Sequence, residues 1–226
     1  MDSRLTLAAE LYDACTLGCD IGTDHALLPC YLLKSGKCRE MILCDISEKA
    51  LAHAREEVRR QHLESRAHLV LADGMDALQG RKCECISIMG MGGENARDIL
   101  LGGKDALHGA TLIVSVHTDQ YLVRSAFMAL SYRIEQERLC YERGRYYIVW
   151  RAVPGEMQLT PDEIAFGTPL LFAPSPMLAD YLAFRLHVLE KKLEGLEKAG
   201  ERQEREIEET RYAIAFYRHI ADRRPA

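Results

Sequence analysis

Residues 17–29 read LGCDIGTDHALLP, a short apolar run followed by a glycine turn and a second apolar segment. The run 17–21 is typical of a buried strand, and 27–35 has helical periodicity that Gly36 ends. Gly22, in the turn between them, has no Cβ and therefore allows the backbone to approach a ligand closely. A strand, a glycine turn and a helix in this order predict the first unit of an α/β protein with a parallel sheet.

The same alternation continues as far as Val153. Further strands are expected at 40–44, 68–71, 84–88 and 111–116, and helices at 4–15, 48–62 and 120–130. Two late runs, 133–141 and 146–153, are joined through Arg143-Gly144-Arg145, which is a hairpin signal. The predicted fold class is therefore α/β, with a mostly parallel sheet that ends in an antiparallel hairpin.

The composition changes at Pro154-Gly155. A loop with several prolines follows, and then a helical stretch over 177–222 whose apolar residues form one stripe. Gly200 interrupts this stripe, which favours two antiparallel helices packed as a short coiled-coil hairpin. A chain of 226 residues suits one large core with an appendage. We therefore expect one domain at 1–155 and a helical C-terminal element at 156–226.

The formal net charge is −5, from 29 Lys and Arg residues against 34 Asp and Glu residues. Such a chain is not a polycation, so any contact with nucleic acid must be local. No apolar run is long enough to span a bilayer and the first residues do not resemble a secretory signal, so we expect a cytoplasmic protein. The eight cysteines have no C-x-x-C spacing. We interpret them as reduced core residues and expect no metal site.

Acidic residues and glycines follow four of the predicted strands, at the edge of the sheet where ligands bind in open α/β folds. These candidate cofactor-binding residues are Asp20, Gly22, Asp45, Ile46, Asp73, Gly74, Gly90, Met91 and Gly92. The pattern indicates a nucleoside-type cofactor. The first turn lacks the full G-x-G-x-x-G that a dinucleotide pyrophosphate requires, so S-adenosylmethionine fits better than NAD.

The position of each candidate along the sheet edge suggests which part of that cofactor it meets. Asp45 follows the second strand, where an acid can accept hydrogen bonds from both ribose hydroxyls. The run 73–74 is expected near the adenine. Asp20, Gly22 and Gly90 are expected near the charged methionine part.

Three runs together resemble a known family: DIGTDHALLP at 20–29, DG at 73–74 and GMGG at 90–93. They are similar to the bacterial tRNA methyltransferases that modify N1 of the adenosine at tRNA position 22. Phe166-Gly167, followed by the helical hairpin, is also similar to that family. The resemblance implies a Rossmann-like class I methyltransferase fold, S-adenosylmethionine as the cofactor, and a helical element that helps to hold tRNA.

Two positions depart from the family pattern. The run 116–119 reads Val-His-Thr-Asp where members commonly carry a Gln-Pro-Asn-type run, and Leu27 stands where Tyr is usual. The altered run keeps two alternatives open. One is a methyltransferase of the same fold that acts on another RNA or a small molecule, and the other is a catalytically silent binding protein.

The chemistry of methyl transfer from a sulfonium requires little beyond correct positioning of the two reactants. Attack by adenine N1 leaves a cationic base that loses a proton from N6, so a carboxylate or imidazole near that amine would help. The candidate catalytic residues are Asp24, His25 and Asp119, with His117 beside them. Asp24 and Asp119 could instead cap the helices that follow, which is the favoured interpretation of Asp119, and His25 could be structural.

Overall fold

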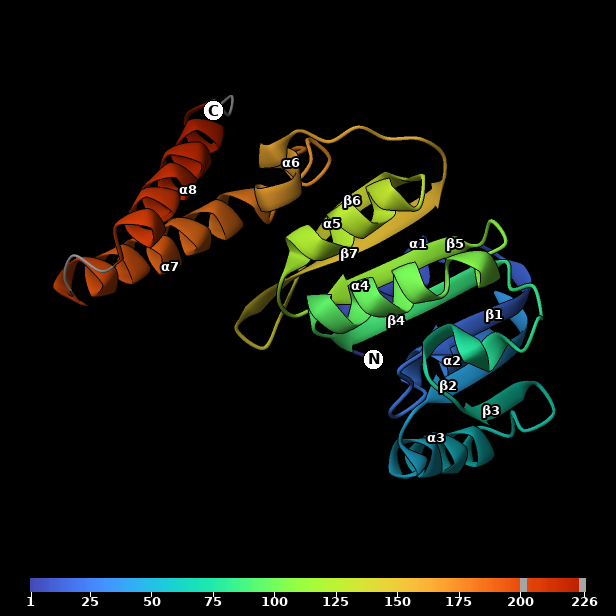
Figure 1. The fold of residues 1–226 in the computed structure, drawn as a ribbon. Coiled ribbons are helices and arrows are strands. Elements are labelled where there is room, and N and C mark those ends of the chain that lie inside the picture. The colour runs from blue at the N-terminus through green and yellow to red at the C-terminus, as the bar shows by residue number, and fades with distance from the viewer. Residues whose placement is uncertain (200–202, 224–226) are drawn as a thin grey trace. The chain divides into compact units, whose positions relative to one another are not determined.

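In the computed structural model, which describes residues 1–199 and 203–223, seven strands form one sheet in the order β3-β2-β1-β4-β5-β7-β6. The strands are β1 (Cys15–Ile21), β2 (Cys38–Asp45), β3 (Ala67–Leu71), β4 (Cys85–Met91), β5 (Thr111–Val116), β6 (Tyr132–Glu142) and β7 (Arg145–Pro154). Strands β1 to β5 are parallel, whereas β7 pairs antiparallel with both β5 and β6 (Figure 1). The predicted fold class, including the terminal hairpin, is confirmed.

Helices cover both faces of this sheet. They are α1 (Ser3–Leu11), α2 (Leu27–Lys34), α3 (Glu48–Arg60), α4 (Gly93–Gly102), α5 (Gln120–Ala129) and α6 (Pro161–Phe166), with short 3-10 turns η1 (Gly74–Leu78) and η2 (Lys104–Ala106). Helices α1, α2 and α3 contact one another in sequence on one face, and α4 and α5 pack together on the other (Figure 1). The apolar core on the first face is nearly closed to solvent, so the carboxyl edge of the sheet is held by a rigid frame.

Local capping explains where the first and third helices begin. The Asp2 carboxylate accepts a hydrogen bond of 2.8 Å from the Leu5 N–H, and the Ser47 hydroxyl accepts one of 3.3 Å from the Ala50 N–H. The first helix ends at Leu11, earlier than the expected residue 15. The chain becomes extended at Tyr12, and β1 starts pairing with β2 at Cys15, so that pairing replaces the last helical turn.

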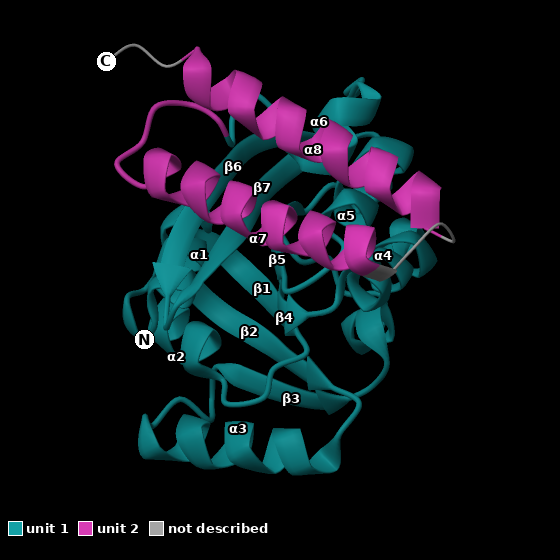
Figure 2. Cartoon of the chain, turned by 90° about the vertical axis from the view of Figure 1, so that its left-hand side faces the viewer, with its two compact units in different colours: residues 1–171 teal, residues 172–226 magenta. Residues whose placement is uncertain are grey.

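The chain forms two compact units, Met1–Leu171 and Phe172–Ala226 (Figure 2). The first unit extends beyond the boundary at 155 that composition suggests. Helix α6, in a segment expected to be a loop, begins with a capping box between Thr160 and Glu163 and packs against α5. The Arg124 guanidinium also donates a hydrogen bond of 3.0 Å to the Ile164 carbonyl, which ties this segment to the first unit.

The second unit is a hairpin of two helices, α7 (Leu178–Ala199) and α8 (Glu204–Asp222). Ion pairs join the two helices in antiparallel register: Lys192 with Glu206 at 2.8 Å, Arg211 with Glu197 at 2.7 Å, and Arg218 with Glu190 at 2.7 Å. The two predicted helices are therefore confirmed, while the break expected at Gly200 lies outside the described residues. Within the described ranges, no helix has the length and apolar character that crossing a membrane requires.

Candidate active site

A cleft of about 480 Å³ opens at the carboxyl ends of β1, β2 and β4. Its lining comes from these strands, from η1 and from the first turns of α4. The lining residues are Ile21, Gly22, Cys44, Asp45, Ile46, Ala72, Asp73, Gly74, Met89, Gly90, Met91, Asn95, Asp98 and Ile99. Most of the residues expected to bind a cofactor are thus brought together around one cavity. Asp20 and Gly92 are the expected members that do not line it.

Asp45 stands at the end of β2, on one side of the cleft. Its Oδ1 accepts a hydrogen bond of 2.8 Å from the Ser47 N–H, which fixes the carboxylate at the start of α3. The next residue, Ile46, is 73% exposed although it is apolar. A fixed carboxylate beside an exposed aliphatic side chain offers hydrogen-bond acceptors for a sugar and a flat apolar surface for a ring.

The turn after β1 brings bare backbone to the cleft. Gly22 has φ +79°, and a Cβ at this position would lie 3.0 Å from the Met91 Cε. The N–H groups of Gly22 and Thr23 both donate to the Cys44 carbonyl at 2.9 Å, so the turn is held against β2. Any other residue would be strained here and would crowd the cavity wall.

Asp20 lies beneath the cleft rather than on its surface. It is 6% exposed and accepts a hydrogen bond of 2.5 Å from the Ser87 hydroxyl on the neighbouring strand β4. Burial raises the pKa of Asp20 to about 6, even though the Ser87 hydrogen bond opposes that rise. The structure therefore places Asp20 in a buried contact between β1 and β4, one residue before Ile21, which lines the cleft.

Asp119 does not cap the helix that follows it, so the favoured capping interpretation is wrong. It adopts a left-handed conformation with φ +53°, and its side chain makes no capping hydrogen bond to α5. This turn packs closely against α4, since a Cβ on Gly93 would lie 2.5 Å from the Asp119 carbonyl oxygen. Asp119 is thus held beside the GMGG run, against Gly93.

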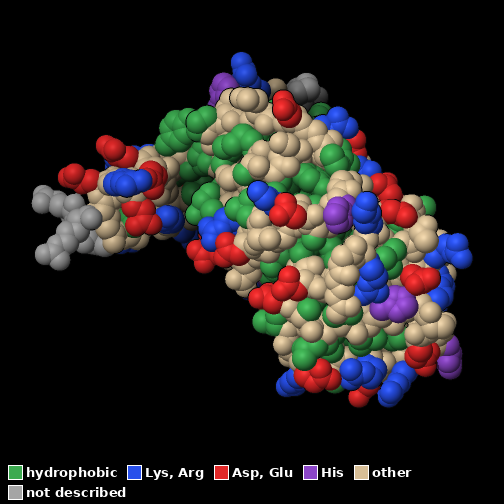
Figure 3. Space-filling view, turned by 45° about the vertical axis from the view of Figure 1, so that its right-hand side comes forward, with side chains coloured by type: hydrophobic (Ala, Val, Ile, Leu, Met, Phe, Trp, Pro, Cys, Tyr) green, Lys and Arg blue, Asp and Glu red, His purple; other side chains and the backbone are tan. Residues whose placement is uncertain are grey.

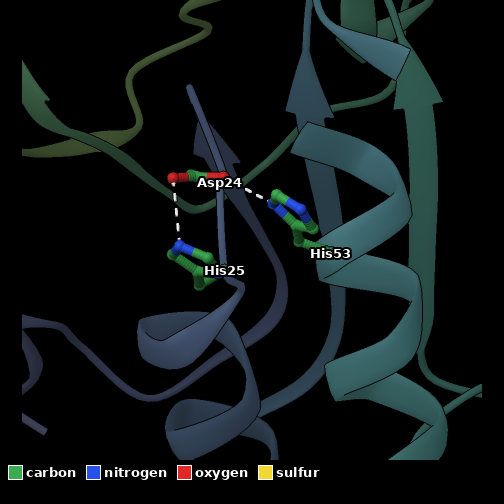
Figure 4. Close-up of side chains that lie close together, drawn as sticks. All are labelled: Asp24, His25 and His53. Carbon is green, nitrogen blue, oxygen red and sulfur yellow. Dashed lines mark hydrogen bonds and ion pairs between the residues drawn. The ribbon is translucent and has the colours of Figure 1, made fainter. Parts of the chain in front are cut away.

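Asp24 and His25 lie together but outside the cleft lining. Asp24 contacts the His25 Nε2 and the His53 Nδ1, both at 3.3 Å (Figure 4). Asp24 does not cap the next helix either, because the residue at the cap is Ala26 in a left-handed conformation, with no side-chain hydrogen bond. The two residues flank the turn of Gly22, on the side that faces α3.

Three further residues meet at Gly90, and motif reasoning identified only one of them, His117. The Arg4 guanidinium lies against Gly90 and 5.1 Å from the Tyr147 ring centroid, and its Nη1 is buried without a hydrogen-bond partner among the described residues. His117 packs edge-on against Tyr147 with ring centroids 5.7 Å apart. Although His117 reaches the surface, partial burial and the Arg4 charge lower the pKa of its imidazole, which therefore stays neutral at pH 7.

Arg4 and Tyr147 carry no sequence signal, because they belong to an opening helix and to a strand of the late hairpin. The cleft residues Asn95, Asp98 and Ile99 were also missed, although they closely follow the GMGG run.

On the face drawn in Figure 3, basic and acidic side chains are interspersed. That face does not present a continuous basic track for phosphates.

Comparisons with known proteins agree with this geometry. Residues 1–150 match the model of a methyltransferase domain family. The tRNA (adenine(22)-N(1))-methyltransferase of Bacillus subtilis is 28% identical over 180 residues, which cover 77% of this chain and 74% of that protein. The resemblance inferred from the motifs is therefore confirmed.

Solved structures resemble the chain over almost its full length. M. capricolum TrmK in complex with S-adenosyl-homocysteine has a TM-score of 0.85 at 26% identity, with 98% of both chains covered. Streptococcus pneumoniae Sp1610, a putative tRNA (m1A22) methyltransferase in complex with S-adenosyl-L-methionine, has a TM-score of 0.83 at 26% identity, covering 98% of this chain and all of that one. Given its fold, its cleft and the family match over 1–150, the chain belongs to the methyltransferase domain family.

Proposed function

We propose that this protein is an S-adenosylmethionine-dependent methyltransferase that methylates N1 of adenosine 22 in tRNA. The observation that carries the proposal is the cleft at the carboxyl edge of β1, β2 and β4, lined by an acid at the end of β2 and by bare glycine backbone. The B. subtilis relative and the S. pneumoniae Sp1610 structure, described as a tRNA (m1A22) methyltransferase, support this substrate class.

The cleft fits a nucleoside with an amino-acid tail. Asp45 would accept hydrogen bonds from the ribose, and Ile46 and the run 73–74 would enclose the adenine. Gly22, Gly90 and Met91 would line the methionine part. When bound, S-adenosylmethionine supplies a methyl group on a sulfonium. Asp20 and Gly92 support this wall from outside the cavity.

The target base would enter on the side of Gly90 that Arg4, His117 and Tyr147 surround. Tyr147 offers a ring for stacking, and Arg4 offers a charge for a phosphate or base oxygen. The neutral His117 imidazole can accept a hydrogen bond from an exocyclic amine. These groups would hold the acceptor across Gly90 from the cofactor.

Proton removal from the methylated base is assigned to Asp24, His25 or Asp119. Asp24 and His25 follow Gly22 by two and three residues, and Asp119 is held against Gly93. A carboxylate or imidazole in these turns could orient the N6 amine or take its proton. Asp24→Ala is expected to lower single-turnover methyl transfer by about 10²-fold while leaving cofactor affinity within a few-fold.

We assign the helical hairpin of the second unit to tRNA contact. We assign the protein to the cytoplasm, because its proposed substrate is there.

A second candidate function is methylation of another RNA by the same cleft. The Val-His-Thr-Asp run at 116–119 favours it, because this run differs from that of the tRNA-modifying family. Nucleoside mass spectrometry of tRNA from cells that lack the protein separates the two, since only the leading proposal predicts loss of N1-methyladenosine at position 22.

The decisive test in vitro combines cofactor binding with methyl transfer. Asp45→Ala should weaken S-adenosylmethionine binding by about 1.5–3 kcal/mol in calorimetric titration, because it removes a charged acceptor from two hydroxyls. Asp76→Ala is the matched control, since Asp76 is an exposed acid of η1 that does not line the cleft. Affinity of Asp45→Ala within twofold of the parent would remove Asp45 from the cofactor site. Equal methylation of tRNA that carries guanosine at position 22 would remove the assigned substrate.

A further inference from the structure

Three side chains from two elements converge outside the cofactor cleft. Asp24 and His25 belong to the turn after β1, and His53 projects from α3 toward them (Figure 4). One ligand atom from each lies within 4.8 Å of the other two. None of the three lines the cofactor cleft, whereas His25 and His53 line a separate hollow between α2 and α3.

The spacing of these atoms suits a small divalent cation. The Asp24 Oδ2 lies 3.3 Å from the His25 Nε2, and its Oδ1 lies 3.3 Å from the His53 Nδ1. Ligands about 2.0–2.2 Å from a tetrahedral zinc ion are separated from one another by roughly 3.3 Å. The two imidazole rings are stacked, with centroids 5.1 Å apart and planes inclined by 12°, so both ring edges meet one carboxylate.

The surroundings are anionic and open to solvent. Glu56 and Glu57 line the same hollow as the two histidines, and Arg60 is paired with Glu57. The side chains of Asp24 and His25 are each 60% exposed, so a metal ion can reach them and can keep a water in a fourth position. Two imidazoles and one carboxylate favour zinc or a similar transition metal over magnesium or calcium.

We propose that Asp24, His25 and His53 form a zinc site, with solvent as the fourth ligand. The metal would tie the turn after β1 to α3. It would also occupy the carboxylate and imidazole of Asp24 and His25, so zinc should inhibit methyl transfer. This second consequence rests on the proposed function, whereas the binding site does not.

Titration of the full-length protein with Co²⁺ and Zn²⁺ tests the site directly. His53→Gln should weaken binding at least tenfold, because it removes one of three protein ligands. His68→Gln is the matched control, since His68 pairs with Glu40 at 2.8 Å on the surface and belongs to no group of three ligands in the described chain. This control should bind the metal like the parent.

The absorption spectrum of bound cobalt distinguishes the proposed site from metal binding by cysteines. This control is needed because all eight cysteines are free and thiolates also bind these metals. We expect a spectrum without sulfur-to-cobalt charge transfer. Sulfur bands, equal affinity of His53→Gln and the parent, or no saturable binding at millimolar metal would each overturn the site.

Inhibition is measured as the ratio of methyl-transfer rates with and without zinc. The ratio should fall in the parent protein and in His68→Gln, and should stay near one in His53→Gln. If the protein binds zinc as expected but does not methylate tRNA, the metal site stands and the proposed function fails. If methyl transfer occurs but zinc leaves the rate of the parent unchanged, the inhibitory consequence is wrong.

Discussion

Two buried carboxylates on strands β1 and β6 of the same sheet have opposite surroundings. Glu137 on β6 is 1% exposed and fully compensated: its Oε1 accepts from the Arg124 Nε at 2.8 Å and Nη2 at 2.6 Å, and its Oε2 accepts from the Thr168 N–H at 3.0 Å. Asp20 on β1 is 6% exposed, and within the described chain it forms no ion pair. Burial raises the pKa of Asp20 to about 6, and the hydrogen bond from Ser87 offsets only part of this rise.

The difference in charge compensation distinguishes a region that stabilises the fold, around Glu137, from a region next to the cofactor cleft, around Asp20. A buried charge that keeps its cation and its backbone N–H avoids the cost of an unpaired charge, and here these bonds join α5, β6, α6 and the segment after α6. A buried charge without a cation costs stability. Such a cost is typical of functional sites, and Asp20 immediately precedes Ile21 and Gly22, which line the cleft.

Of the three substitutions that test this comparison, Glu137→Ala should change the free energy of unfolding most. It leaves Arg124 buried and unpaired, and it removes the acceptor of the Thr168 N–H, so we expect a loss of about 3–5 kcal/mol in the free energy of unfolding. Urea denaturation measures it. Glu135→Ala is the control, because the Glu135 side chain on the same strand is 40% exposed and its partner Arg151 also pairs with Asp13, so its loss should cost less than about 1 kcal/mol. Similar losses for the two variants would show that burial of the Glu137 pair does not matter.

Asp20→Asn should act in the opposite direction. The pKa of Asp20 is raised from 3.8 to about 6 in the folded state, so the wild type is most stable with Asp20 protonated and loses stability as pH rises from about 4 to about 6. Asparagine carries no charge and can still accept from Ser87. We expect the variant to be more stable than the parent by about 2–3 kcal/mol at pH 7.5, with the difference vanishing near pH 4.

Unfolding free energies of both proteins across this pH range test that expectation. A difference that does not change with pH would mean that Asp20 is not the group responsible. A less stable variant at pH 7.5 would mean that the carboxylate is compensated in the folded state.

Ser87→Ala should change the free energy of unfolding least, and it tests whether the Ser87 hydroxyl stabilises the charged form of Asp20. Ser87 donates the hydrogen bond that favours the charged form of Asp20, so its removal should raise the pKa of Asp20 further and cost about 1 kcal/mol of stability. Ser115→Ala is the control, because Ser115 is equally buried but its hydroxyl has no hydrogen-bond partner among the described residues. An NMR titration of the Asp20 carboxyl group measures the shift. An unchanged pKa in Ser87→Ala would show that the hydroxyl does not stabilise the charge.

The amino-acid sequence by itself determined the order of the strands, most of the helices, and half of the residues that line the cleft. Period-two and period-3.6 patterns are local properties of the chain, and the carboxyl ends of parallel strands meet at one edge. Gly22, Asp45 and Gly90 could therefore be assigned to one cavity from their positions alone. The antiparallel hairpin was equally predictable, because a glycine turn between two alternating runs is a local signal.

The tertiary structure alone decided which side chains meet across elements. Arg4 reaches Tyr147 and Gly90 because α1 packs against the late strands, and His53 reaches Asp24 because α3 faces the turn after β1. Neither contact has a local signature. Backbone conformation likewise overrode the expected caps, since left-handed residues at Ala26 and Asp119 begin the helices without side-chain hydrogen bonds. Such contacts depend on packing between segments far apart in the chain, and no local pattern of residues encodes them.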